Sequence, residues 1–219
     1  MSLLEVSCPH CGKTVSFERL DHIDASKQPE MIRKVRNNEA FLFSCGHCRY
    51  RTHMDYSFLY SEPSSLFMIY YAADQEDYGE AWKLLTGQSE KHGLDEEKLK
   101  GMKKRLVTSH EAFQEKLMIF DGGLDDRIIE IMKGIAYATL RQKQPELHPE
   151  KVRFDLGGDG NHYFRFEEQG KTVAAYAFER PMYEQIRTGL KEIVDRLSEN
   201  QPVINAEWSA KALAEIQKI

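Results

Sequence analysis

Four cysteines, arranged as two CxxC pairs, constrain this chain of 219 residues more than any other feature. Cys8 and Cys11 form CPHC, Cys45 and Cys48 form CGHC, and the sequence holds no further cysteine. Two thiolate pairs, each closing a tight two-residue turn, supply the tetrahedral sulfur set that zinc prefers. Disulfides are rare as scaffolding in a reducing cytoplasm. The pattern therefore predicts a structural Zn²⁺ site whose ligands are all four cysteines.

The linker between the two pairs holds 33 residues, more than the roughly 15 to 20 usual between paired CxxC turns. A short helix over residues 28–35, with its apolar residues on one face, explains the excess length. Extended segments are predicted at residues 14–17 and 40–44, so each cysteine pair lies at the turn of a hairpin, as in a zinc ribbon. Gly12 and Gly46 are expected to supply the backbone bend that such turns require.

The same tetrapeptides permit a second interpretation, which is thiol–disulfide chemistry. CPHC and CGHC match, as bare strings, the active-site motifs of thiol oxidants and disulfide isomerases. In the thioredoxin fold, however, the first cysteine opens a helix whose N-terminus lowers the pKa of the thiol. The sequence around Cys45 is strand-like on both sides. Structural zinc is therefore the leading prediction, and a thiol–disulfide oxidoreductase is the alternative.

Other sequence features limit the enzymatic interpretations. His10 and His47 lie inside the turns, but four sulfurs already saturate a tetrahedral ion, so both imidazoles are expected to face solvent. A saturated ion has no open position for a reactive water. The sequence contains no HExxH, GxSxG or GxxxxGK[ST] motif. We therefore predict no catalytic residue.

Charge and hydropathy restrict the partners. The net charge is −5, and residues 1–56 carry eight Lys or Arg against seven carboxylates, so nucleic acid is not favoured and a nucleic-acid-binding ribbon is only an alternative. No run approaches the ~18 to 20 apolar residues of a membrane span, and the sequence does not open with a basic leader followed by an apolar stretch. We expect a cytoplasmic location and no membrane partner.

The middle of the chain predicts one strand and three helices. Residues 66–71 form a compact apolar run, expected to complete the sheet of the ribbon. Helical periodicity is predicted over residues 77–86, 95–119 and 125–140. The last two are expected to form an antiparallel hairpin, and His110 is expected to be a core histidine on the apolar face.

An acidic cluster surrounds the start of the third of these helices. Its members are Asp121, Asp125, Asp126 and Glu130. Carboxylates near a helix N-terminus favourably meet the helix dipole, so the cluster is interpreted as structural rather than catalytic. Glu130 is expected on a solvated face, with Arg127 and Lys133 as counterions.

The C-terminal part alternates as three strands over residues 152–156, 162–166 and 172–178, around GGDGN and EEQGK turns. This pattern predicts a three-stranded antiparallel meander. Helices over residues 182–197 and 206–219 are expected to cover its aromatic face rather than leave the rings free to stack on bases.

Several segments beyond the cysteines resemble the CpXC domain proteins of bacteria and archaea. They are QPEMIRKV, AFLFSCGHC, FMIYY and EKLMIFDGGLDDRIIEIMK, and the resemblance covers about residues 5–133. It implies a metal-binding ribbon but, because the family is functionally uncharacterised, no substrate and no catalytic residue. Arg49 follows the second pair where many zinc ribbons place glycine, which predicts a wider second hairpin.

The whole sequence predicts an α+β protein in three parts. These are a four-cysteine zinc ribbon with a helical insertion at residues 1–72, a helical hairpin region at 73–144, and a meander with covering helices at 145–219. The last two parts are expected to share one core, because no low-complexity linker separates them. The predicted function is a cytoplasmic binding or adaptor module with structural zinc and an unidentified protein partner; the sequence leaves the oligomeric state open.

Overall fold

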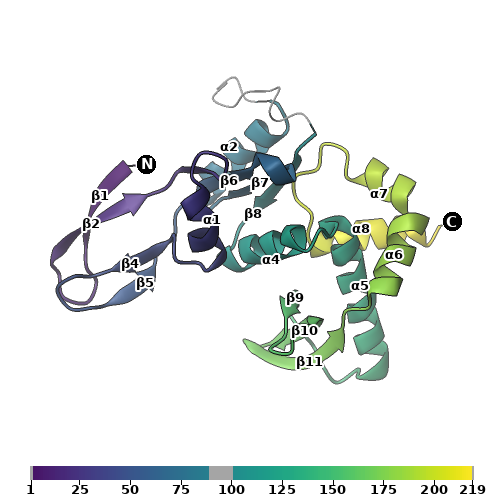
Figure 1. The fold of residues 1–219 in the computed structure, drawn as a ribbon. Coiled ribbons are helices and arrows are strands. Elements are labelled where there is room, and N and C mark those ends of the chain that lie inside the picture. The colour runs from purple at the N-terminus through teal and green to yellow at the C-terminus, as the bar shows by residue number, and fades with distance from the viewer. Residues whose placement is uncertain (1, 89–100, 219) are drawn as a thin grey trace. The chain divides into compact units, whose positions relative to one another are not determined.

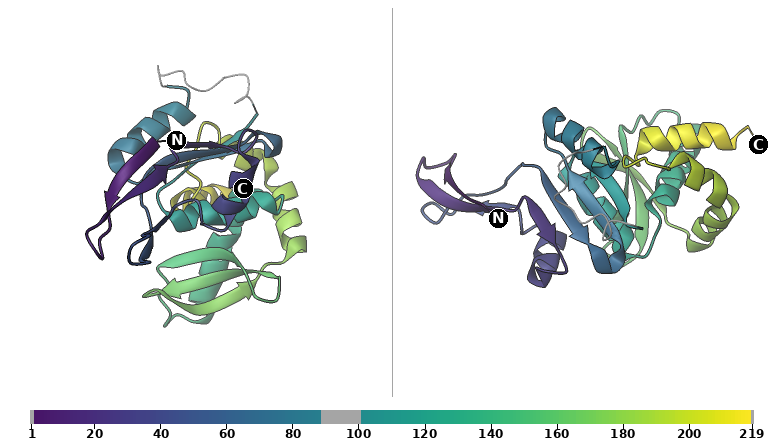
Figure 2. Two further views of the ribbon diagram at one scale, coloured as in Figure 1. Left: turned by 60° about the vertical axis from the view of Figure 1, so that its left-hand side comes forward. Right: turned by 90° about the horizontal axis from the view of Figure 1, so that it is seen from above.

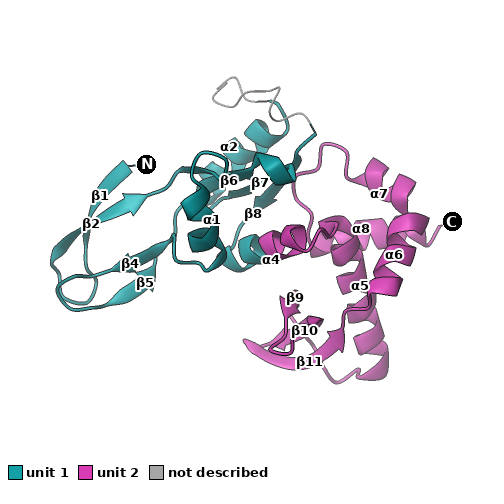
Figure 3. Cartoon of the chain, viewed as in Figure 1, with its two compact units in different colours: residues 1–114 teal, residues 115–219 magenta. Residues whose placement is uncertain are grey.

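A computed structural model describes residues 2–88 and 101–218 of the chain. The chain divides into two compact units, unit 1 (residues 1–114) and unit 2 (residues 115–219), shown in Figure 3. In the described residues, seven α-helices accompany eleven strands in four small sheets. The α+β class predicted from the sequence is confirmed.

Unit 1 opens with two β-hairpins whose turns carry the cysteine pairs (Figure 1). The first pairs β1 (Ser2–Ser7) with β2 (Thr14–Arg19), and the second pairs β4 (Leu42–Ser44) with β5 (Arg51–His53), both antiparallel. Between them lie the short strand β3 (His22–Asp24) and helix α1 (Pro29–Arg36). The helix begins at a proline, ends in basic residues and buries Met31 and Val35. The inserted helix predicted over residues 28–35 is therefore confirmed.

A separate four-stranded sheet forms the centre of unit 1, and its order is β3-β6-β7-β8. Its main strands are β6 (Phe58–Glu62), β7 (Phe67–Tyr71) and β8 (Lys103–Val107). β6 and β7 pair antiparallel, whereas β3 and β8 are parallel to their neighbours. Helix α2 (Gln75–Leu85) follows β7 and is capped by Asp74, whose side chain accepts the N–H of Asp77. The expectation that residues 66–71 complete the ribbon sheet is wrong, because this strand pairs with β6 and β8. The two hairpins extend from one end of this sheet (Figure 2).

The helix predicted over residues 95–119 is also wrong in part. Residues 103–107 form β8, and α4 (His110–Asp121) begins only at His110. Ser109 accepts the N–H of Ala112 on its hydroxyl, which starts the helix there. Met102 and Leu106 are spaced for one face of a helix. Residues 105–107 nevertheless form a strand, because parallel pairing with the buried strand β7 buries all three of them. The remainder of the predicted helix, residues 95–100, lies outside the described residues.

His110 lies among aromatic rings in the core of unit 1. Its ring centroid is 4.5 Å from that of Tyr71 and 5.3 Å from that of Phe41. Burial lowers the pKa of His110 below its ordinary value, against the opposing charge of Asp55. The ring packs within the aromatic core, as expected, although 20% of the side chain is exposed.

Unit 2 contains the predicted meander, with the strand order β11-β10-β9. The strands are β9 (Lys151–Leu156), β10 (His162–Glu168) and β11 (Lys171–Ala177), all antiparallel. Phe154, Phe164 and Phe166 are buried with the helices, as expected for rings that pack rather than stack on bases. The helices of unit 2 are α5 (Asp126–Lys143), α6 (Arg180–Gly189), α7 (Lys191–Leu197) and α8 (Ala206–Ile216). The helix that lies against β9 and β10 is α5, which the sequence did not predict as a cover, whereas α8 packs on α5 and α7. The single helix predicted over residues 182–197 is thus two helices, which meet at Leu190 after the helix-weakening Gly189.

The surroundings of α5 differ from the prediction in two respects: the helix against which it packs, and the burial of Glu130. α5 packs mainly against α8 instead of running back along α4, so the predicted antiparallel helical hairpin is not formed. Glu130 is buried, not solvated: it contacts Lys133 at 3.1 Å and Lys116 at 3.5 Å. Lys116 also contacts the fully buried Asp126 at 2.8 Å. Burial of these carboxylates is tolerable because two lysine ammonium groups compensate them.

The acidic cluster is therefore divided: Asp126 and Glu130 belong to an internal ion network, Asp125 is half-buried beside Arg127, and Asp121 is exposed. Arg127 and Lys133 act as counterions as expected, since Arg127 binds Asp125 at 2.6 Å and Lys133 binds Glu130. No helix within residues 2–88 and 101–218 has the length and apolar character needed to cross a membrane.

Candidate metal centre

The two cysteine turns share one backbone geometry. In the first, the Gly12 N–H donates to the Cys8 carbonyl at 2.9 Å, and in the second the Arg49 N–H donates to the Cys45 carbonyl at the same distance. Each turn is closed by a further bond, from the Cys8 N–H to Lys13 and from the Cys45 N–H to Tyr50. The two turns therefore share one backbone hydrogen-bonding pattern around their cysteines.

The residue after each second cysteine adopts the left-handed conformation. Its φ is 70° at Gly12 and 62° at Arg49. The expectation for Gly12 is confirmed, but Gly46 has no positive φ, and Arg49 takes the left-handed position instead. The predicted widening of the second hairpin is wrong, because its closing hydrogen bond is as short as that of the first. The sequence did hold a sign of this conformation: Arg49 directly follows the second cysteine of its pair, just as Gly12 follows Cys11.

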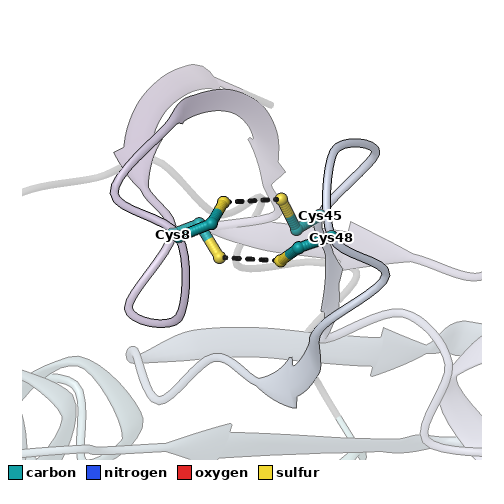
Figure 4. A group of neighbouring side chains, drawn as sticks. Cys8, Cys45 and Cys48 are labelled. Atoms are coloured by element: carbon teal, nitrogen blue, oxygen red, sulfur yellow. Dashed lines mark hydrogen bonds between the residues drawn. The ribbon is translucent and has the colours of Figure 1, made fainter.

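The four sulfurs converge from the two hairpins (Figure 4). Cys8 Sγ lies 3.7 Å from Cys48 Sγ, and Cys11 Sγ lies 3.7 Å from Cys45 Sγ. All four sulfur atoms lie within 4.8 Å of one another. A tetrahedral ion with metal–sulfur bonds of about 2.3 Å holds its sulfurs about 3.8 Å apart. The cysteines are unoxidised, since a disulfide needs sulfurs about 2.05 Å apart.

Aromatic contacts join the two hairpins that carry the cluster. Phe17 of β2 and Phe43 of β4 are both buried, with ring centroids 6.4 Å apart. At the turns, His10 of the first hairpin stacks on Tyr50 of the second, with centroids 5.8 Å apart. The sulfur cluster is therefore supported by side chains from both hairpins.

The histidines near the turns are not part of the cluster. Among the described residues, the group of side chains close enough to share an ion holds cysteines alone. His47 is exposed, and the His53 ring bonds instead to the carbonyl of Asn38 at 3.1 Å. The arrangement fits the expectation that four sulfurs suffice.

Comparison with known protein families supplies the deciding observation. The family model described as CpXC protein matches residues 6–133, more than half of the chain. The chain belongs to the CpXC family. The match includes both cysteine turns, the second hairpin, the four-stranded sheet and the first part of α5, whereas most of β1 precedes it and β9–β11 and α6–α8 lie beyond it. The comparisons with curated proteins and with solved structures gave no match.

The thiols of the CpXC cluster do not have equal pKa values. Burial acts to raise the pKa of Cys45, but hydrogen bonds from the backbone N–H groups of Cys48 and His47 and from neighbouring thiols lower it to about 7. A backbone hydrogen bond at Tyr50 acts to lower the pKa of Cys48, but burial and the three other thiols raise it to about 12. Thiolates this close repel one another, so full ionisation of the cluster requires a cation among them.

The chemistry of this donor set limits what it could hold. Four sulfur donors gathered within 4.8 Å of one another suit soft or borderline metals, zinc and iron above all. Calcium and magnesium require oxygen donors and are excluded as occupants. The CpXC cluster is thus compatible with a bound metal ion held entirely by protein sulfur.

Proposed function

We propose that this CpXC protein binds one zinc ion through Cys8, Cys11, Cys45 and Cys48, and that it works as a zinc-stabilised binding or adaptor module. The observation that carries the proposal is the meeting of sulfurs from two hairpins, in two cross-hairpin pairs at 3.7 Å, close to the edge of a tetrahedral zinc–sulfur site. The module so defined occupies about residues 1–72. A reducing compartment such as the cytoplasm would keep its thiols available to the metal.

The ion has a structural task in this proposal. β1 is almost entirely exposed, and β4 and β5 each span three residues, so the hairpins bury few apolar side chains beyond Phe17 and Phe43. Small domains of this kind depend on a metal, and structural zinc contributes on the order of 10 kcal/mol to folding. Zinc would strengthen this small core by joining the two turns.

A binding role suits the site better than a catalytic role. Four sulfur ligands leave zinc no position for a water or a substrate. Both CxxC pairs lie in hairpin turns, so neither has the helix N-terminus that activates the thiol of an oxidoreductase. Leu3 and Leu4 of β1 are 73% and 39% exposed, so this strand offers an apolar side chain to a protein partner on each of its two faces.

Elemental analysis of the purified chain tests this proposal. We expect about one zinc per chain in the wild type and loss of that zinc in Cys45→Ser, which removes a ligand on which the tetrahedron depends. His47→Ala, a matched change inside the same turn, should keep its zinc because its imidazole is not a ligand. A Cys45→Ser chain as stable and as zinc-loaded as the wild type would contradict the proposal. Reduction of insulin disulfides by a metal-free wild type would favour the oxidoreductase alternative.

A further inference from the structure

The four cysteines differ in their access to solvent. Cys8 and Cys45 are 2% and 1% exposed, and Cys48 is half-buried. Cys11 is the most exposed residue of the four. A small oxidant arriving from solvent therefore meets Cys11 more readily than the buried Cys8 and Cys45.

A sulfur of the other hairpin lies close to Cys11. Cys11 Sγ is 3.7 Å from Cys45 Sγ, and the remaining sulfurs form a second cross-hairpin pair, Cys8 with Cys48, at the same distance. Closing the first pair to a disulfide of about 2.05 Å requires an approach of about 1.7 Å. The bond so formed would join the same two hairpins that zinc joins.

We propose that Cys11 is a peroxide-sensitive modification site, whose oxidation exchanges the zinc link between the hairpins for a Cys11–Cys45 disulfide. The proposal rests on the zinc site proposed above. It assigns unlike roles to the four sulfurs: Cys11 reacts with the oxidant, Cys45 resolves the product, and Cys8 and Cys48 stay reduced. The hairpins remain connected in both states, so the oxidised ribbon keeps its fold after the metal leaves.

The chemistry balances with hydrogen peroxide as the oxidant. The Cys11 thiolate attacks one peroxide oxygen, the O–O bond breaks, and hydroxide leaves with its electron pair and takes up a proton to become water. The Cys45 thiolate then attacks the Cys11 sulfur, the S–S bond forms, the S–O bond breaks, and a second hydroxide leaves and is protonated. Two thiolates are oxidised by two electrons and one peroxide is reduced to two waters. Zinc loses two of its four ligands and is released, and a dithiol reductant reverses the exchange.

Peptide mapping of the zinc-loaded wild type tests this directly and needs no variant that could fail to fold. Zinc content is measured first, and the full chain is then treated with graded hydrogen peroxide while a chromogenic chelator reports released zinc. Free thiols are alkylated before digestion without reductant. Trypsin cuts after Lys13, Arg36 and Arg49, which places Cys8 and Cys11 on one peptide and Cys45 and Cys48 on another.

We expect zinc release in step with one linked pair of these peptides, and recovery of zinc binding after reduction. Fragmentation at the Cys8–Pro9 bond should assign the link to Cys11, and fragmentation between Cys45 and Cys48 should assign it to Cys45. A disulfide confined to either turn, oxidation that begins at Cys8, or zinc that stays bound while Cys11 is oxidised would overturn the inference alone. A wild type that holds no zinc before peroxide is added would overturn the proposed function, and this inference with it.

Discussion

Gly12 and Arg49 show how the same backbone position can be filled by unlike residues. Both follow the second cysteine of a pair, and both have φ near +65°, where a residue with a Cβ is strained. Glycine removes this strain at the first turn, whereas the second turn accepts it at Arg49. The turn is therefore fixed by its hydrogen bonds, and the residue adapts to it.

Gly12→Ala should lower the free energy of unfolding of the zinc-loaded chain by about 1 kcal/mol, because alanine strains the left-handed conformation. Gly46→Ala is the matched control, since Gly46 lies in the equivalent pair without a positive φ. An added Cβ meets no atom within 4 Å at either position, so steric contact does not distinguish them. Urea unfolding measures both variants. Equal stabilities would show that the backbone conformation at Gly12 is not the reason for its glycine.

At this scale the sequence was most informative about ligands and least informative about conformation. The spacing of Cys8, Cys11, Cys45 and Cys48 predicted that their sulfurs could converge, and the structure brings them together. The prediction that Gly46 supplies the bend was wrong, because glycine permits a left-handed φ without requiring one. The burial of Glu130 was missed because its partner Lys116 lies on a different helix, a contact that helical spacing does not reveal.

At the scale of the elements, apolar periodicity predicted most helices and strands near their observed bounds. The prediction failed at residues 103–107, where both the helical and the strand period fit the apolar residues. It also failed at Leu190, where one helix ends and the next begins without a proline. In the first case the deciding interaction is parallel pairing with β7, whose residues lie more than thirty positions earlier in the chain. Such non-local pairing leaves no mark in a short sequence window.

The contact between α5 and α8 provides a prediction at this scale. A Cβ added to Gly134 would lie 2.6 Å from Leu213 Cδ1 and 2.8 Å from Ser209 Oγ. The Ser209 hydroxyl is buried and donates to the Glu130 carbonyl at 2.7 Å, so it cannot move aside without losing that bond. We expect Gly134→Ala to destabilise unit 2 by about 1–3 kcal/mol, despite the better helix propensity of alanine.

Gly79 in α2 is the control, because a Cβ there meets no atom within 4 Å. Gly79→Ala should stabilise its helix by up to about 1 kcal/mol, as expected for an unobstructed helical position. Thermal unfolding followed by circular dichroism compares the two. A gain in stability for Gly134→Ala comparable to that for Gly79→Ala would show that α5 and α8 are not closely packed at this point.

At the scale of the whole molecule, the end of the CpXC match does not coincide with the boundary between the two units. The match ends at residue 133, inside α5, whereas unit 2 begins at residue 115. The resemblance seen in the sequence identified the family correctly. It could not show that the hairpins and the sheet of β3, β6, β7 and β8 are separate, because β3 joins β6 in parallel across an intervening helix and hairpin.

In the proposed site, one ion joins two turns whose cysteines are separated by a 33-residue linker. X-ray absorption at the zinc edge of the purified chain measures the atoms around that ion and their distances. We predict four sulfur neighbours at about 2.3 Å and no nitrogen or oxygen neighbour. A chain without zinc, or a zinc shell that contains imidazole nitrogen or water oxygen, would contradict the four-sulfur site.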